Sequence, residues 1–234
     1  MGIKLIIAAL LISLFALTNT AFASKYYNRR LCSDSEYTCI KVKRGDSWNK
    51  LFPDATTQRI IRRINRMNIE LSAGMMIAIP KDLEKNDPLA FSPLPNRITP
   101  LDRTVIVVDL DKQAFGAYDA SGKLVHWGPV SGGQDYCPDI GRPCHSPTGI
   151  FYVQYKEGPD CFSSKYPLPD GGAPMPYCMY FHGGYAMHGC VLPGYNASHG
   201  CIRMFTEDAE WLNKNFVEFG AKTTEVIVQQ EFEY

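Results

Sequence analysis

The sequence lacks an excess of charge of either sign and contains no low-complexity segment. Its 24 lysines and arginines balance 24 aspartates and glutamates. A basic surface usually draws a protein to nucleic acid or to an anionic membrane, so we expect no nucleic-acid partner here. The 234 residues suffice for one medium-sized domain together with a small one.

Long hydrophobic runs are also absent, except near the start of the chain. There Lys4 precedes the apolar run Leu5–Leu17, and the small-x-small sequence Ala21-Phe22-Ala23 follows. A short apolar core before such a site is typical of a cleaved secretory signal, whereas a membrane anchor needs about 20 apolar residues. We therefore expect residues 1–23 to be a signal peptide and the mature protein to be exported without a membrane anchor.

The eight cysteines have a particular meaning in an exported chain, because disulfides persist in oxidising compartments. Three pairs are close in sequence and bracket polar or Gly/Pro-rich loops: Cys32 with Cys39, Cys137 with Cys144, and Cys161 with Cys178. Spacing alone does not fix connectivity, so these pairs are hypotheses. They leave Cys190 and Cys201 over, and a bond between those two is a further alternative.

Residues 37–80 have the pattern of a small α+β module. The expected elements are a strand at 37–42, a short helix capped by Asp46 or Ser47, a helix at 56–67 and a strand at 75–79. This order, with Asn68 in the middle and Gly74–Pro80 at the end, resembles a LysM domain. The resemblance implies binding to glycans that contain N-acetylglucosamine, such as peptidoglycan. The alternative is a small packing domain without a ligand.

Arginines recur at three- and four-residue spacing along the second of these helices: Arg59, Arg62, Arg63 and Arg66. A basic helix face can bind nucleic acid. In a neutral, exported protein we expect instead that this face is exposed to solvent.

The rest of the chain divides into a linker and a β domain. Several prolines among polar residues predict a semi-rigid linker over 81–102. From Arg103 onward, short β-branched and aromatic runs alternate with Gly, Asp and Pro, which predicts a mainly antiparallel, sandwich-like β domain over 103–229. The expected elements are strands at 105–110, 114–118, 124–127, 150–155 and 225–229, and one helix near 206–216.

Two nearby segments, Tyr185–Gly189 and Ser198–Arg203, concentrate the residue types that a nucleophilic cysteine needs. Such a cysteine requires a base to form its thiolate and donors to hold the oxyanion it creates. His188 can act as the base. Gly200 lets the backbone approach closely, so that the amides of Cys201 and of Gly200 itself can face the oxyanion.

The sequence Ser-His-Gly-Cys-Ile-Arg after a hydrophobic-His-Gly strand end resembles the signature of the YkuD-type L,D-transpeptidases. The resemblance extends over about 103–228 and includes Val107–Leu110 and Ser146–Phe151. It implies an enzyme of the bacterial periplasm or cell envelope that acts on peptidoglycan stem peptides and glycan strands. It also implies catalysis without a cofactor or a metal ion.

Carried over by position, the resemblance assigns catalytic roles to Cys201 as acylated nucleophile, His188 as base, Gly189 through the carbonyl that orients the imidazole, and Gly200. It assigns substrate contacts to Ser198, His199 and Arg203. Many members have more residues between the base and the cysteine. His182, which is also followed by a glycine and should lie at a hairpin tip, is therefore the alternative base and a further substrate-contact candidate.

Other readings compete with a transpeptidase. A papain-like or NlpC-type peptidase is excluded, because it needs a histidine after the cysteine and none follows Cys201. A zinc site built from His182, His188, His199, Cys190 and Cys201 fits no common ligand spacing. An L,D-carboxypeptidase using water, a transfer to a protein lysine, and a non-catalytic peptidoglycan-binding protein stay open.

Overall fold

The computed structural model of the protein describes residues 26–83, 87–167 and 170–230. The predicted signal peptide therefore lies outside the described residues. Within those three ranges, every helix is too short or too polar to cross a membrane.

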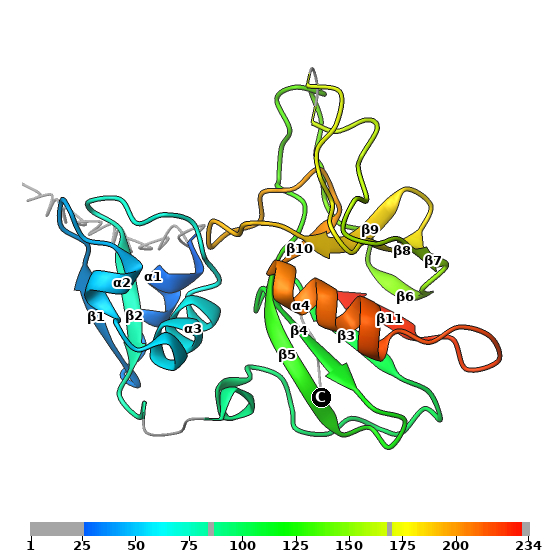
Figure 1. Ribbon diagram of the computed structural model, residues 1–234, viewed down its shortest axis with the longest axis horizontal. Coiled ribbons are helices and arrows are strands. Elements are labelled where there is room, and N and C mark those ends of the chain that lie inside the picture. The colour runs from blue at the N-terminus through cyan, green and yellow to red at the C-terminus, as the bar shows by residue number, and fades with distance from the viewer. Residues whose placement is uncertain (1–25, 84–86, 168–169, 231–234) are drawn as a thin grey trace, which may run out of the picture.

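The N-terminal module is a two-stranded antiparallel sheet covered by three helices (Figure 1). Its elements are α1 Tyr27–Leu31, β1 Tyr37–Lys41, α2 Trp48–Leu51, α3 Ala55–Ile64 and β2 Met76–Pro80. Ser47, rather than Asp46, caps α2 by accepting a hydrogen bond from the amide of Lys50. Trp48 and Ile61 form the buried centre of the module.

The segment after the module packs against the β domain. It contains the 3-10 helix η1 Pro88–Phe91, whose Pro88 carbonyl accepts a hydrogen bond from the Trp127 indole. Leu94 is buried in the same cluster. The sequence predicts a semi-rigid connection from its prolines; these apolar side chains additionally fix it to the sheet.

The remaining strands form one nine-stranded mixed sheet in the order β6-β11-β3-β4-β5-β10-β9-β8-β7. They are β3 Val105–Asp109, β4 Ala114–Tyr118, β5 Leu124–Ser131, β6 Gly149–Tyr152, β7 Tyr155–Lys156, β8 Met179–His182, β9 Tyr185–Gly189, β10 Ile202–Met204 and β11 Glu225–Gln229. β10 pairs with β9, and β11 with β3, in parallel; the other pairs are antiparallel. The sheet curls, so that β6 also contacts β8 near the other end of the order (Figure 1). The predicted mainly β fold is confirmed.

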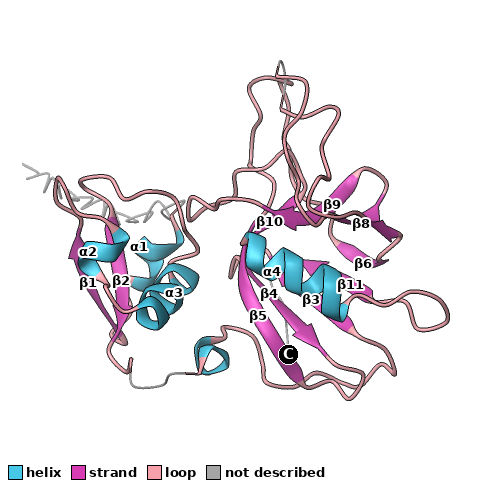
Figure 2. Ribbon diagram, in the orientation of Figure 1, coloured by secondary structure: helices cyan, strands magenta, loops and turns pink. Residues whose placement is uncertain are grey.

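Both faces of the central strands are covered. One face packs against α4 Thr206–Trp211 and the turn of π-helix that continues it, η2 Leu212–Phe216 (Figure 2). The other face packs against the segment that contains Leu94. Every residue of β3 and β4 is therefore buried, which explains why these strands are almost continuously apolar instead of alternating.

Part of the basic face of α3 forms an interface with the β domain instead of facing water. Arg63 and Arg66 are only 5% and 3% exposed. Arg63 donates hydrogen bonds to the carboxylate of Asp208, at 2.8 Å, and to the carbonyl of Trp127. Arg66 donates to three backbone carbonyl oxygens. The expectation of a solvent-exposed face is wrong for these two residues, because the β domain supplies acceptors that helical spacing within the module does not reveal.

Candidate active site

The parallel pairing of β9 with β10 brings the predicted catalytic residues to one face of the sheet. Arg203 lies opposite His188 in the register. Because side chains alternate along a strand, Arg203 of β10 shares a face with His188 of β9, and Cys201, the residue just before β10, lines the same cavity. The alternate positions point into the core and are fully buried: Met187, Ile202 and Met204.

The three residues line a cavity of about 540 Å³. Its walls include residues from two long loops that rise above β9 and β10 in Figure 1. One loop is closed by the Cys137–Cys144 disulfide and the other by Cys161–Cys178. The third predicted bond, Cys32–Cys39, ties α1 to β1. All three predicted disulfides are confirmed, and each of the two bonds in the β domain holds a wall of the cavity.

Cys190 and Cys201 are both free thiols that line the cavity. The Cys190 amide donates to the carbonyl of Met204, three residues beyond Cys201 on β10. At about 3.3 Å per strand residue, this offset separates the two cysteines by roughly 10 Å along the sheet. A disulfide needs Cα atoms within about 7 Å. A Cys190–Cys201 bond is therefore incompatible with this backbone.

His188 has the tautomer of a base. Its Nδ1 lies 3.0 Å from the carbonyl oxygen of Gly189, the contact that the family resemblance implies. A carbonyl can only accept, so Nδ1 carries the proton and Nε2 keeps its lone pair. Burial lowers the pKa of His188 to about 4 and outweighs the opposing effect of the Gly189 contact, while the charge of Arg203 adds a smaller lowering effect. The imidazole is therefore neutral at pH 7.

Cys201 is a partly buried thiol that needs help to ionise. Burial raises its pKa, although the amide of Ala186 and the charge of Arg203 partly offset this effect. Within the described residues no hydrogen bond joins its Sγ to His188. Such contacts often tighten only when substrate binds. The arrangement thus pairs a protonated thiol with a neutral base.

Gly200 and Ser198 shape the turn that presents Cys201. Gly200 has φ of +118°, and a Cβ there would lie 2.5 Å from the ring of Tyr185, so only glycine fits. Its amide donates to Ser198 Oγ at 2.9 Å, and Ser198 Oγ donates to the carbonyl of Cys201. Ser146 Oγ holds the Gly200 carbonyl at 2.8 Å. The Gly200 amide is thus engaged within the turn and does not face an oxyanion here.

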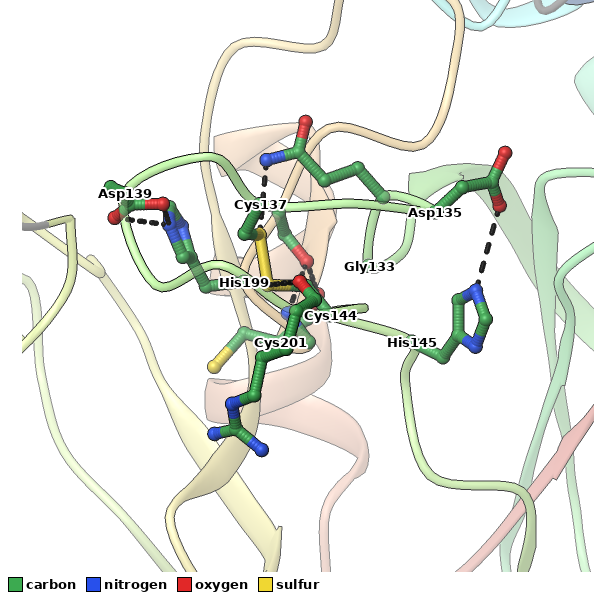
Figure 3. The surroundings of a disulfide bond; sticks show 12 residues. Gly133, Asp135, Cys137, Asp139, Cys144, His145, His199 and Cys201 are labelled. Atoms are coloured by element: carbon green, nitrogen blue, oxygen red, sulfur yellow. Dashed lines mark hydrogen bonds and ion pairs between the residues drawn. A yellow bond between two sulfur atoms is a disulfide. The ribbon is translucent and has the colours of Figure 1, made fainter.

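His199 connects the two walls of the cavity. Its Nε2 lies 2.8 and 2.9 Å from the carboxylate oxygens of Asp139, next to the Cys137–Cys144 disulfide (Figure 3). Its ring stacks on Tyr166 from the other loop, with centroids 5.1 Å apart. His199 therefore holds the loops together as well as lining the cavity.

His182 lies at the end of β8 beside the Gly183-Gly184 turn, the hairpin tip that the sequence predicts. Its exposed ring packs against Phe151, with centroids 4.8 Å apart. The residues that line the cavity include His188 and do not include His182. The geometry favours His188 as the base.

Several cavity residues escaped the sequence analysis: Arg142, Lys165, Tyr166 and Tyr180. Burial raises the pKa of Tyr180 to about 12, so its hydroxyl keeps its proton and stays a donor. Three of the four lie in segments bracketed by the predicted cysteine pairs, and that bracketing is the signal that would have found them. Loop residues carry no periodicity that would reveal a shared cavity.

Two groups in the described part of the chain have the spacing of metal ligands. They are Cys137, Cys144 and His199, and Glu157, Cys161 and Cys178. Their cysteines are already joined as disulfides. Neither group corresponds to the five-residue zinc alternative.

Comparison with known proteins gives a match over the β domain. The family model YkuD, described as the L,D-transpeptidase catalytic domain, matches residues 103–228. An L,D-transpeptidase structure from Xylanimonas cellulosilytica is 26% identical, with 74% of this chain and 79% of that chain covered and a TM-score of 0.53. One from Enterococcus faecium is 27% identical over 55% of this chain and 50% of that chain, with a TM-score of 0.44. Comparison with curated proteins gives no match.

Proposed function

The chain belongs to the L,D-transpeptidase family of the YkuD catalytic domain, and on that premise we propose that it is an exported peptidoglycan transpeptidase with Cys201 as nucleophile. Peptidoglycan peptides are the substrate class that the family implies. The observation that carries the proposal is the shared face of Cys201, His188 and Arg203 inside one cavity. Three disulfides are consistent with a protein that works outside the cytoplasm.

In the acylation half-reaction, Nε2 of His188 takes the proton from the Cys201 thiol while Sγ attacks the carbonyl between the diamino acid of a stem peptide and its terminal D-alanine. The Cys201 amide is the candidate oxyanion donor, since the amide of Gly200 is engaged by Ser198. The carbon–nitrogen bond then breaks. His188 returns the proton to the leaving D-alanine amine, and a thioester is left. A conjugate acid with a pKa of about 4 gives up that proton readily.

In the second half-reaction, an amine from another stem peptide attacks the thioester. His188 accepts the proton lost by the amine and returns it to the Cys201 sulfur as the carbon–sulfur bond breaks. The product is a 3→3 cross-link. Because the thioester stores the activated acyl group, the reaction needs no nucleotide. Arg203, which faces the cavity from β10, is the candidate for holding a carboxylate of the stem peptide.

Other acceptors at the same thioester give related activities. Water makes the enzyme an L,D-carboxypeptidase, and a protein lysine makes it a protein-anchoring enzyme. A non-catalytic wall-binding protein is the alternative of a different class. The cavity residues Cys201, His188 and Arg203 favour an enzyme over that alternative.

For residues 37–80 we propose a LysM-type glycan-binding role. The support is the element order strand–helix–helix–strand, with β1 paired to β2 along its whole length. Asn68 lies in the stretch between α3 and β2, as the resemblance requires. With a peptidoglycan-binding module next to a peptidoglycan-acting domain, the module would hold the same polymer on which the domain acts.

Acylation of Cys201 is tested by intact-protein mass spectrometry after incubating the mature protein with a carbapenem or a tetrapeptide muropeptide. We expect a covalent adduct on the wild type and none on Cys201→Ala. His188→Ala should slow adduct formation by about 10²- to 10⁴-fold, the usual contribution of a general base. His182→Ala is the matched control and should react at close to the wild-type rate.

Two results would contradict the assignment. If His182→Ala loses the adduct while His188→Ala keeps it, the base is His182. If the wild type forms no adduct even after mild reduction, the wall-binding alternative is favoured over catalysis.

A further inference from the structure

The segment 190–197 joins the base to the nucleophile, and it leaves the β domain to reach the N-terminal module. In Figure 1 it is the orange trace that extends from β9 and β10 toward α1 and α3. His188 lies just before this segment and Cys201 just after it. Its path therefore bears directly on how the two residues are held relative to each other.

The middle of the segment is bound by the module. The backbone amide of Leu192 donates to the side-chain Oδ1 of Asn68 at 2.7 Å, and the backbone amide of Asn68 donates to the Leu192 carbonyl at 3.0 Å. The Tyr27 amide donates to the carbonyl of Gly194 at 2.8 Å. Pro193 forms a strand-like bridge with Met67. Leu192 is fully buried, so these contacts are shielded from water.

The end of the segment is bound by the β domain. Ser131 Oγ donates to the carbonyl of Tyr195 at 2.8 Å and accepts from the amide of Ala197 at 3.1 Å. Oδ1 of Asn196 accepts from the amide of Gly132 at 2.8 Å. The contacts from Ser131 and Gly132 lie at the end of β5. The segment 190–197 leads into the turn Ser198–Cys201, called the catalytic turn below, which therefore has one support in each part of the protein.

Removing the module contacts would leave buried backbone groups of Leu192 without partners. Unpaired buried amides and carbonyls are strongly disfavoured, so the segment would move to satisfy them. A shift of about 1 Å at reacting groups can cost a factor of roughly 100 in rate. Asn68 lies outside the cavity, so its effect on the chemistry would pass through this segment.

We propose that the N-terminal module positions the catalytic turn, with Asn68 as the positioning residue that fixes the segment between His188 and Cys201. The proposal rests on the proposed role of Cys201 as nucleophile. It gives the module a second task beside glycan binding. It also makes the module a part of the active-site framework instead of a tethered accessory.

The test compares Asn68→Leu, which removes the acceptor, with Asn68→Asp, which keeps an oxygen acceptor in place, in the full chain. The limiting rate of Cys201 acylation by a carbapenem is measured together with the half-saturating concentration. We expect Asn68→Leu to lower the limiting rate roughly 10- to 100-fold, with little change in half-saturation, and Asn68→Asp to restore most of it. Asn49→Leu is the matched control, because the exposed Asn49 loses only a contact with Gln58 within the module.

A second readout separates this proposal from the proposed function. Alkylation of Cys201 by iodoacetamide, followed at the Cys201 peptide so that Cys190 is resolved from it, needs no transpeptidase activity. We expect Asn68→Leu, and not Asn49→Leu, to shift the pH dependence of this alkylation. If the wild type is not acylated but that shift is seen, the positioning role stands while the proposed function fails.

If Asn68→Leu is acylated and alkylated at the same rates as the wild type, the positioning role is wrong. Equal losses of rate in Asn68→Leu and Asn68→Asp would also overturn it. If Asn68→Leu does not fold, Tyr26→Leu replaces it, since Tyr26 contacts the segment through the ring of Tyr195 at 5.0 Å. A slowed limiting rate in that variant supports the proposal, and an unchanged rate contradicts it.

Discussion

At the residue scale, His188 couples the chemistry of the cavity to the stability of the protein. It is 5% exposed, and burial lowers its pKa to about 4 from an ordinary value of 6.5. Unfolding returns the imidazole to water, where its pKa is ordinary again. Between these two values the unfolded chain binds a proton that the folded protein does not, so acid favours unfolding.

We predict that this histidine makes the protein less stable as pH falls from 6.5 toward 4. The pKa difference corresponds to about 3 kcal/mol of unfolding free energy, fully present above pH 6.5 and lost through that window. Urea unfolding of the wild type and of His188→Gln at several pH values isolates the contribution. Equal pH dependence in the two proteins would show that His188 is not buried in its neutral form.

At the element scale, the contact between α3 and α4 joins the two parts of the chain through a buried ion pair. Asp208, 1% exposed, accepts from Arg63 at 2.8 Å and lies 2.7 Å from Nε2 of His126. Its second oxygen has no hydrogen-bond partner among the described residues. Arg63 is therefore the main compensation for a buried carboxylate. Asp208 belongs to α4, which follows β10 and the catalytic turn.

We predict that Arg63→Met destabilises the protein by about 3–5 kcal/mol, because it leaves the Asp208 carboxylate buried without its cation. Arg59→Met, on the exposed side of the same helix, should change stability by less than about 0.5 kcal/mol. Chemical denaturation at pH 7 measures both. Adding Asp208→Asn to Arg63→Met should recover part of the loss; if it makes the loss larger, the carboxylate is not the source of the effect.

Local sequence patterns predicted the elements better than their packing. Runs of β-branched and aromatic residues bounded by turn residues located β3, β4 and β11, and short cysteine spacings located all three disulfides. β5 is longer than expected, because it continues through Pro129 to Ser131 opposite β4 and β10. Which strands pair in parallel, and that α3 buries two arginines, depends on contacts between residues far apart in sequence.

The same limit applies to the site. The motif around Cys201 named His188, Cys201 and Arg203 as site residues through the family it resembles. The pairing of β9 with β10, which brings them to one face, was not predicted from the sequence. Asp139, Tyr166 and Asn68 come from three other segments. The predicted cysteine pairs bracket Asp139 and Tyr166, but nothing in the sequence around Asn68 indicates that it contacts the segment before Cys201.

At the scale of the whole molecule, the interface between the two parts fixes the proposed glycan-binding module relative to the cavity. Besides the contacts of Asn68 and Arg63, Arg30 of α1 forms an ion pair with Asp111 of the β domain at 2.9 Å. Contacts at several places along the interface oppose independent movement. A glycan strand held by the module would therefore present its stem peptides at a restricted set of distances from Cys201.

We predict that the full-length Cys201→Ala protein cosediments with insoluble peptidoglycan and that soluble N-acetylglucosamine oligomers compete for this binding. The variant keeps the module while removing the nucleophile, so any retention is non-covalent. If free stem peptide displaces the bound protein and the oligomers do not, the binding belongs to the cavity. That result would contradict the LysM-type role.

The three disulfides have a consequence for how the chain matures. Each joins cysteines only 7, 7 or 17 residues apart, and none connects the module to the β domain. Closing a short loop costs little entropy, so a chain entering an oxidising compartment from its N-terminus can form each bond with the next cysteine to emerge. Cys190 and Cys201 emerge last, when every earlier thiol already has a partner. In this order of emergence, Cys201, the proposed nucleophile, meets no earlier thiol that is still unpaired apart from Cys190.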